Sequence, residues 1–288
     1  MQQTELPDGT PMPALGLGTW RMGESAAARK AEVAAVRLAI ELGYRLIDTA
    51  EMYGEGGAET VVGQAIAEAI RAGTVRREEL VVVSKVYPHN ASREGAVAAC
   101  ERSLQRLGLD QIDLYLLHWR GQHALRETVA GMHALQAGGR IRHWGVSNLD
   151  VADMNELIAA SPGLAPGAGC ATDQVYYSLG ERGAEFSLLP WLRKRSMPLM
   201  AYSPIDQGQR ATDRTLAEIG QSRGLSAAQV ALAWVLAQDG VIAIPKAVSA
   251  LHLRENLAAA DIVLSADEIR RIDARYPPPK RKTALAMI

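Results

Sequence analysis

Apolar and polar positions along this chain follow two alternating patterns. Short apolar runs, which suit strands buried on both faces, alternate with longer segments whose apolar residues recur at helical spacing. This alternation predicts repeated strand–helix units around a parallel sheet. The eight predicted strands span residues 15–18, 45–48, 80–85, 112–118, 142–147, 171–175, 198–202 and 241–245, and a predicted helix follows each of them.

Two of the predicted helices have a clear apolar face. The residues on these faces are Val33, Val36 and Ile40 in the first helix, and Val97, Cys100, Leu104 and Leu107 in the second. Glu and Arg fill the opposite faces, so each helix is expected to pack one side against a sheet. Eight units without a Pro-rich or Gly-rich linker favour a (β/α)8 TIM barrel, an α/β fold that forms one domain over residues 1–288. An open, doubly wound sheet is the alternative.

Two segments lie outside the repeat. Residues 4–10 contain the turn sequence Pro7-Asp8-Gly9 between short strand-like pieces, which predicts an N-terminal β-hairpin at one end of the barrel. After Tyr276 the chain continues with three prolines and a basic triplet at 280–282. Because proline cannot continue a helix, we expect an extended C-terminal tail across the surface.

Composition and charge narrow the class of protein. Hydrophobic residues make up 48% of the 288 residues and the formal net charge is -1, which allows a large core and gives no general attraction to nucleic acid or anionic membranes. No stretch approaches the roughly 20 apolar residues of a membrane span. Cys100 and Cys170 lie outside any zinc-binding pattern, so we expect no metal. These features predict a cytoplasmic monomer without nucleic-acid or membrane partners.

Polar residues end three consecutive apolar strands. They are Asp48, Lys85 and His118. In (β/α)8 barrels the active site lies at the C-terminal ends of the strands, and neighbouring strands are roughly 4.8 Å apart, so these three side chains can converge. Tyr53 lies in the loop after Asp48, close enough to reach the same place.

These four residue types together can transfer a proton. A tyrosine, with an ordinary pKa of about 10, is protonated at neutral pH and can donate its proton to a carbonyl oxygen under reduction. Lys85 would stabilise the phenolate that forms, and Asp48 would keep Lys85 charged. His118 would orient the substrate oxygen. Taken singly, each residue could be structural, and a Schiff-base mechanism with Lys85 as nucleophile is an alternative that the neighbouring carboxylate disfavours.

Seven short motifs occur in a fixed order at the predicted strands. They are Gly16-Leu17-Gly18-Thr19-Trp20, Asp48-Thr49-Ala50-Glu51-Met52-Tyr53-Gly54, Ser84-Lys85-Val86, Leu116-Leu117-His118-Trp119, Gly145-Val146-Ser147-Asn148, Ala201-Tyr202-Ser203-Pro204 and Ile244-Pro245-Lys246. On these motifs the chain resembles the aldo-keto reductase family over essentially its whole length. The resemblance implies an oxidoreductase that reduces carbonyl groups to alcohols with a nicotinamide cofactor. It gives the same catalytic set, namely Asp48, Tyr53, Lys85 and His118.

The resemblance also implies that NADPH lies extended across the mouth of the barrel. Ser147, Asn148 and Gln174 would bind its carboxamide. Tyr202 would stack on the nicotinamide ring, and Lys246 would meet the adenosine phosphate. The other cofactor-binding residues implied in this way are Gly18, Thr19, Trp20, Asp48, Ser203, Pro204, Ser249, His252, Glu255 and Asn256.

One position departs from the family pattern. The arginine that usually holds the phosphate corresponds to His252, and Arg254 lies two residues later. Arginine can grip a phosphate through two parallel hydrogen bonds, whereas a neutral histidine has one donor and no charge. Lys246 is still present, and Arg254 could either turn toward the phosphate or only solvate its helix. We therefore expect NADPH ahead of NADH.

Within the family, the chain is most similar to the bacterial methylglyoxal reductase subgroup. The residues that carry this similarity are Glu51-Met52-Tyr53, Val86-Tyr87-Pro88, Gly145-Val146-Ser147-Asn148-Leu149-Asp150 and Lys282-Thr283-Ala284-Leu285. Small 2-oxoaldehydes, other small aldehydes or ketones are the expected substrates. The expected substrate pocket consists of Trp20, Tyr53, Tyr87, His118 and Trp119. The aromatic residues could instead serve ordinary packing, and a non-catalytic NADPH-binding regulatory module of the same fold is the alternative function.

Overall fold

Eight parallel strands form the centre of the structure, a computed structural model that describes residues 2–161 and 169–288. Each strand pairs with its neighbours in chain order. The strands are β3 (Leu17–Gly18), β4 (Leu46–Asp48), β5 (Val81–Val86), β6 (Ile112–Leu117), β7 (Ile141–Ser147), β8 (Cys170–Tyr176), β9 (Leu199–Tyr202) and β10 (Val241–Ala243). All eight lie where the apolar runs predict them.

The sheet closes on itself between its first and last strands. Leu15 and Gly18 form parallel bridges with Ala243 and Lys246, respectively. The amide of Gly16 donates a hydrogen bond to the carbonyl oxygen of Ala243 at 2.9 Å. The predicted (β/α)8 barrel is therefore confirmed, and the open, doubly wound alternative is wrong.

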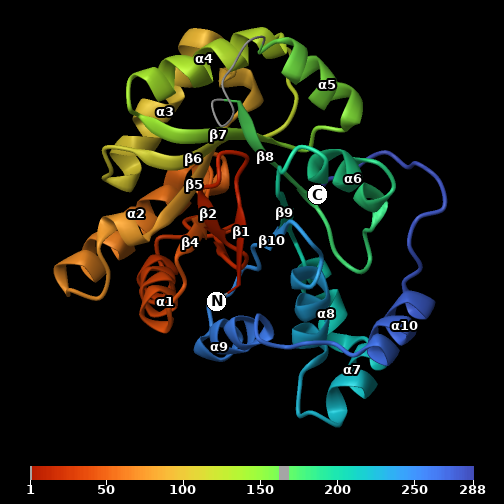
Figure 1. Cartoon of the computed structure of the whole chain (residues 1–288). Coiled ribbons are helices and arrows are strands. Elements are labelled where there is room, and N and C mark those ends of the chain that lie inside the picture. The colour runs from red at the N-terminus through yellow and green to blue at the C-terminus, as the bar shows by residue number, and fades with distance from the viewer. Residues whose placement is uncertain (1, 162–168) are drawn as a thin grey trace.

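Helices lie around the strands (Figure 1). They are α1 (Arg29–Leu42), α2 (Gly57–Arg71), α3 (Arg93–Leu107), α4 (Leu125–Ala137), α5 (Val151–Ala159), α6 (Leu188–Arg193), α7 (Arg214–Gln221), α8 (Ala227–Leu236), α9 (Ala250–Ala259) and α10 (Ala266–Arg275). The predicted apolar faces of α1 and α3 are buried, apart from the half-buried Val97. Among the described residues, no helix is both long and apolar enough to span a membrane.

Local sequence fixes the ends of these helices. In α3, the Ser92 side chain accepts a hydrogen bond from the Gly95 amide, which satisfies a donor that the first turn leaves free. Gly108 ends the same helix with a left-handed φ of 64°, a conformation that glycine adopts without steric cost. Capping at both ends therefore confines α3 to the segment between β5 and β6.

The N-terminal hairpin closes one end of the barrel. Strands β1 (Gln3–Glu5) and β2 (Pro11–Pro13) pair in antiparallel fashion, as predicted. Leu6 and Met12 are buried in a core cluster that includes Leu46, the first residue of β4. Because this end is filled with apolar side chains, the C-terminal ends of the strands remain as the mouth of the barrel.

The C-terminal tail begins after α10 and contains no helix or strand, which confirms the extended conformation expected from its prolines. In Figure 1 it is the blue segment that leads away from α10. Lys282 Nζ lies 2.8 Å from Asp150 Oδ2, at the start of α5. Leu285 packs against the main core. The tail is thus attached to the barrel at points far from α10 in the sequence.

Candidate active site

Three adjacent strands bring the predicted catalytic residues together. Asp48 ends β4, Lys85 lies in β5, and His118 directly follows β6. Tyr53 begins a short 3-10 helix, η1 (Tyr53–Gly56), four residues beyond the Thr49 that follows β4. All four side chains are buried or nearly so, with Tyr53 9% exposed and His118 7% exposed. The structure therefore brings these four residues together at the barrel mouth, as predicted.

Lys85 is the centre of this group. Its Nζ donates hydrogen bonds to Asp48 Oδ2 at 2.8 Å, to the Thr49 carbonyl oxygen at 2.9 Å and to Tyr53 Oη at 3.2 Å. The same nitrogen lies 4.8 Å from the centre of the Tyr53 ring. An ammonium group has three hydrogens, so these acceptors use all of its donors. Lys85 is thus held in contact with a carboxylate and a phenol at once.

Burial and charge set the protonation of the group. Burial lowers the pKa of Lys85, and the Asp48 carboxylate opposes this shift. Burial, followed by the charge of Asp48, raises the pKa of Tyr53 well above its usual value. The phenol is therefore protonated at neutral pH, as a proton donor must be.

His118 faces Tyr53 as a neutral ring. The two ring centres are 5.7 Å apart in an edge-on arrangement. Burial, followed by the charge of Lys85, lowers the pKa of His118 well below its usual value. The buried Nδ1 atom has no hydrogen-bond partner in the described part of the chain. Within residues 2–161 and 169–288, His118 therefore keeps hydrogen-bonding capacity at Nδ1 that no other group uses.

A second network joins the residues expected at the cofactor carboxamide to the catalytic set. Gln174 Nε2 donates to Asp48 Oδ1 at 2.8 Å, and Ser147 Oγ donates to the Gln174 carbonyl oxygen at 2.7 Å. Asn148 Nδ2 donates to Ser147 Oγ at 3.0 Å, and Tyr202 Oη donates to Asn148 Oδ1 at 2.9 Å. The sequence did not predict the contact between Gln174 and Asp48. It connects the two halves of the candidate site.

Asn148 of this network and Ser203, which directly follows Tyr202, adopt left-handed backbone conformations without being glycine. The φ angles are 60° at Asn148, directly after β7, and 48° at Ser203, directly after β9. Such residues are uncommon, and they cluster at functional sites where surrounding contacts hold them. The contacts of Asn148 with Ser147 and Tyr202 provide such a restraint here. The next residue after Ser203, Pro204, is buried.

The expected aromatic wall forms in part. The Trp119 ring lies 4.8 Å from the His118 ring and 6.0 Å from the Tyr87 ring, centre to centre. Trp20 instead has the Arg21 guanidinium 4.5 Å from its ring centre. Thr19, beside it, donates through Oγ1 to the Asp48 carbonyl oxygen at 2.9 Å. Tyr87, Trp119 and His118 therefore make a continuous aromatic row, and Trp20 lies in the turn that follows β3.

The residues expected at the adenosine end lie in a separate group. Lys246 is exposed, and its bridge to Gly18 places it where the barrel closes. Ser249 caps α9 and accepts a hydrogen bond from the His252 amide at 3.2 Å. His252 and Arg254 are exposed, Glu255 is half-buried and Asn256 is buried. The structure thus collects these residues after β10, in a segment separate from the four predicted catalytic side chains.

Sequence reasoning missed Tyr176, the last residue of β8. Its ring is stacked on that of Tyr202, with 5.7 Å between the ring centres and 17° between the planes. Its Oη donates to Asp206 Oδ1 at 2.8 Å. Alternation along β8 could have revealed it, because Tyr176 lies two positions after Gln174 and so shares its side of the strand. In the described ranges, no group of three or more His, Cys, Asp and Glu residues is arranged to hold a metal ion.

Comparison with known proteins identifies close relatives. The model of the aldo/keto reductase family matches residues 14–277. Methylglyoxal reductase YeaE of Escherichia coli (strain K12) is 53% identical over 282 residues, which cover 96% of this chain and 95% of that protein. Glyoxal reductase of Bacillus subtilis (strain 168) is 36% identical over 270 residues, covering 94% and 91%. A crystal structure of an aldo/keto reductase from Klebsiella pneumoniae with NADP and acetate is 48% identical, has a TM-score of 0.91 and covers 99% of both chains.

Proposed function

Since this chain belongs to the aldo/keto reductase family, we propose that it reduces small aldehydes, above all 2-oxoaldehydes such as methylglyoxal, with hydride from NADPH and a proton from Tyr53. One observation carries the proposal. Lys85 Nζ contacts Asp48 and Tyr53 at the same time, in a buried site at the mouth of the barrel. This arrangement suits a phenol that gives up a proton and must be stabilised as a phenolate.

The cofactor fits the polar groups beside the catalytic set. At the end of β7, the Ser147 hydroxyl bonds to the Asn148 side-chain amide and to the Gln174 carbonyl oxygen of β8, and hydroxyl and amide groups of this kind can pair with a carboxamide. Tyr202 offers a half-buried aromatic ring for stacking. When bound, the dihydronicotinamide supplies the hydride. The relative from Klebsiella pneumoniae was crystallised with NADP, which supports the same cofactor for this chain.

The residues of this chain would complete the reduction by proton transfer. As a C–H bond forms at the carbonyl carbon, the C=O π electrons move to the oxygen. That oxygen takes the proton from Tyr53 Oη, and the charge left on the phenolate is stabilised by the Lys85 ammonium at 3.2 Å. Asp48 keeps Lys85 charged against the effect of burial. Neutral His118 would donate a hydrogen bond that orients the substrate oxygen.

The environment of Lys85 opposes the Schiff-base alternative. A nucleophilic amine needs a free lone pair, whereas Lys85 Nζ donates to three acceptors, one of them a carboxylate.

The aromatic row of Tyr87, Trp119 and His118 suits a small carbonyl compound and selects weakly among such compounds. The curated relatives named for methylglyoxal and glyoxal reduction favour 2-oxoaldehydes.

A substrate panel tests the proposal. Purified protein is mixed with NADPH or NADH and with methylglyoxal, glyoxal, an aromatic aldehyde or a simple ketone, and cofactor absorbance is followed. We expect turnover with NADPH that is fastest for the 2-oxoaldehydes. Binding of NADPH without turnover of any carbonyl would instead support the non-catalytic regulatory module.

The cofactor preference has its own test at Lys246. This exposed side chain lies beside the barrel closure, where we propose that it meets the adenosine phosphate of NADPH. Changing Lys246→Met removes one charge, so the KM for NADPH should rise about tenfold while that for NADH stays nearly constant. Equal losses for the two cofactors would place the phosphate elsewhere. The KM for NADPH of Arg254→Met then shows whether Arg254 holds the phosphate in place of the family's usual arginine, whose position is occupied by His252 in this chain.

A further inference from the structure

We propose that Tyr176 is a positioning residue for the nicotinamide ring. It stacks against one face of the Tyr202 ring and fixes the loop after β9. This inference rests on the proposed function, because it assigns a task toward NADPH. Tyr176 and Tyr202 are paired in register on the adjacent strands β8 and β9. Their side chains therefore leave the sheet on the same side, toward the barrel mouth.

The first argument is the geometry of the two rings. They lie 5.7 Å apart with only 17° between their planes, an offset-stacked arrangement that aromatic pairs favour. Tyr176 thus covers part of one face of Tyr202, and a nicotinamide ring would use the other face. The Tyr202 hydroxyl is held separately by Asn148 Oδ1 at 2.9 Å. Contacts within the protein therefore fix Tyr202 both at one face of its ring and at its hydroxyl.

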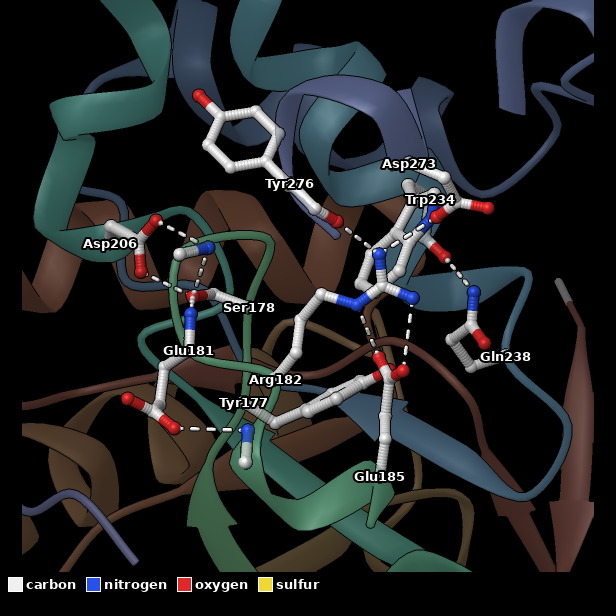
Figure 2. Close-up of polar contacts among 12 residues, drawn as sticks. Tyr177, Ser178, Glu181, Arg182, Glu185, Asp206, Trp234, Gln238, Asp273 and Tyr276 are labelled. Carbon is white, nitrogen blue, oxygen red and sulfur yellow. Dashed lines mark hydrogen bonds and ion pairs between the residues drawn. The ribbon is translucent and has the colours of Figure 1, made fainter. Parts of the chain in front are cut away.

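The second argument is the anchor of Tyr176 itself. Its Oη donates at 2.8 Å to Asp206, a residue that is 2% exposed and begins the 3-10 helix η5 (Asp206–Thr212). Asp206 has a left-handed φ of 50°, which is unfavourable for a residue other than glycine. Its carboxylate is also bonded to the Ser178 hydroxyl and to the Arg210 guanidinium. Figure 2 shows Asp206 beside Ser178 in this network.

These contacts connect the two loops that flank Tyr202. Ser178 belongs to the loop after β8, whereas Asp206 and Arg210 belong to the loop after β9. Arg210 Nη1 donates to the Tyr276 hydroxyl at 2.8 Å, which attaches the same network to the end of α10. The Tyr176 hydroxyl is the point at which this network meets the stacked rings. Loss of the Tyr176 ring should therefore loosen the stacking surface and leave the adenosine-binding segment after β10 unaffected.

Ligand titrations with the full-length protein test the proposal. Dissociation constants are measured for NADPH and for adenosine 2′,5′-bisphosphate, which is the adenosine end of NADPH without the nicotinamide. In Tyr176→Leu, the constant for NADPH should rise about three- to tenfold, the range expected for loss of an aromatic pair, while that for the bisphosphate should not change. Tyr176→Phe keeps the ring and should show a smaller rise. Tyr176→Met serves as a second non-aromatic variant should the leucine variant fold poorly.

The adjacent tyrosine provides a matched control. Tyr177 Oη donates to Glu185 Oε1 at 2.8 Å in the same loop, and Figure 2 shows this pair away from Asp206. Tyr177→Phe should leave both dissociation constants unchanged. In a Tyr202→Leu background, Tyr176→Leu should cause no further loss, because the ring that it supports is gone.

Three results would overturn the inference. They are an unchanged NADPH constant in Tyr176→Leu, equal weakening of both ligands, and the same effect from Tyr177→Phe. Failure of the unmodified protein to bind NADPH would be a different result, which refutes the proposed function itself. The measurement on the unmodified protein therefore separates the two failures.

Discussion

At the scale of the residue, the candidate site depends on two buried charges, those of Lys85 and Asp48. Lys85 is completely buried, and an isolated ammonium there would lose its proton. Asp48 and the Thr49 carbonyl oxygen offset the loss of water, and the third donor is left for Tyr53. The proposed proton donor, Tyr53, is thus next to the ammonium group that would stabilise its conjugate base.

The proposed role of Tyr53 as proton donor is tested by Tyr53→Phe. The ring stays and only the hydroxyl is lost, so kcat for methylglyoxal should fall by about a hundredfold or more while NADPH affinity is largely retained. Tyr87→Phe is the control, because the Tyr87 hydroxyl lies in the proposed pocket wall and, among the described residues, hydrogen-bonds only to Glu55, at 3.4 Å. Near-normal turnover in Tyr53→Phe, measured by steady-state kinetics, would refute the assignment.

The neutral state of His118 predicts a pH profile. Burial lowers its pKa well below the usual value, so the ring gains a proton only in acid and is neutral throughout the range above about pH 6.5. The kcat/KM for an aromatic aldehyde should therefore be constant from about pH 6.5 to 8 with respect to this residue. An inflection near pH 6.5 that disappears in His118→Asn would contradict the prediction.

At the scale of the element, Arg182 joins the loop after β8 to two helices. Its guanidinium binds both carboxylate oxygens of Glu185 at 2.8 and 2.9 Å, and it binds Asp273 Oδ1 at 2.7 Å in α10. It also lies 4.7 Å from the ring centre of Trp234 in α8. Figure 2 shows Arg182 between these three residues. A bidentate, mostly buried contact of this kind fixes direction as well as distance.

Removal of this arginine should reduce stability. In Arg182→Met the Glu185 carboxylate, which is 16% exposed, would lose its cationic partner and keep only the hydrogen bond from Tyr177, and we expect the free energy of unfolding to fall by about 2–4 kcal/mol. Arg214→Met is the control: its bond to Glu218 is made by a side chain that is 92% exposed, so its effect should stay within about 0.5 kcal/mol. Urea denaturation measures both. Equal losses in the two variants would show that the Arg182 contacts stabilise the fold no more than an exposed ion pair does.

At the scale of the whole molecule, closure of the barrel depends on the absence of a side chain. A Cβ atom at Gly18 would lie 2.6 Å from the carbonyl oxygen of Ile244. Since that oxygen belongs to the backbone after β10, it cannot turn away as a flexible side chain would. Gly18 also bridges Lys246, so the first and last strands approach each other here. The same approach brings the segment after β10 beside the mouth of the barrel.

A single methyl group therefore tests barrel closure. Gly18→Ala should lower the free energy of unfolding by about 1–3 kcal/mol, because the two strands must separate to admit it. Gly138→Ala is a suitable control, since its Cβ would lie no closer than 3.3 Å to a neighbouring atom and its backbone is already helical. Thermal and urea unfolding compare the two variants. No difference between them would mean that the closure accommodates a side chain.

Much of this molecule could be predicted from local pattern. Runs such as Leu80 to Lys85 are mostly apolar because strands in a closed barrel are buried on both faces. Each residue of such a strand must meet this requirement, so the strand can be recognised directly in the sequence. Asp48, Lys85 and His118 stand out for the same reason: a charged or polar group at the end of a buried strand needs a partner. The order of the units then places these ends side by side. The fold and the meeting of these side chains at one end of the barrel therefore follow from the sequence.

The contacts between distant segments were decided only by the tertiary structure. Gln174 meets Asp48 across 126 positions, and Tyr176 stacks on Tyr202 because β8 and β9 lie in one particular register. A one-residue shift of either strand would turn those side chains to the other side of the sheet. Sequence periodicity shows which face a side chain takes, but not which partner it meets there. That choice depends on how the whole barrel closes.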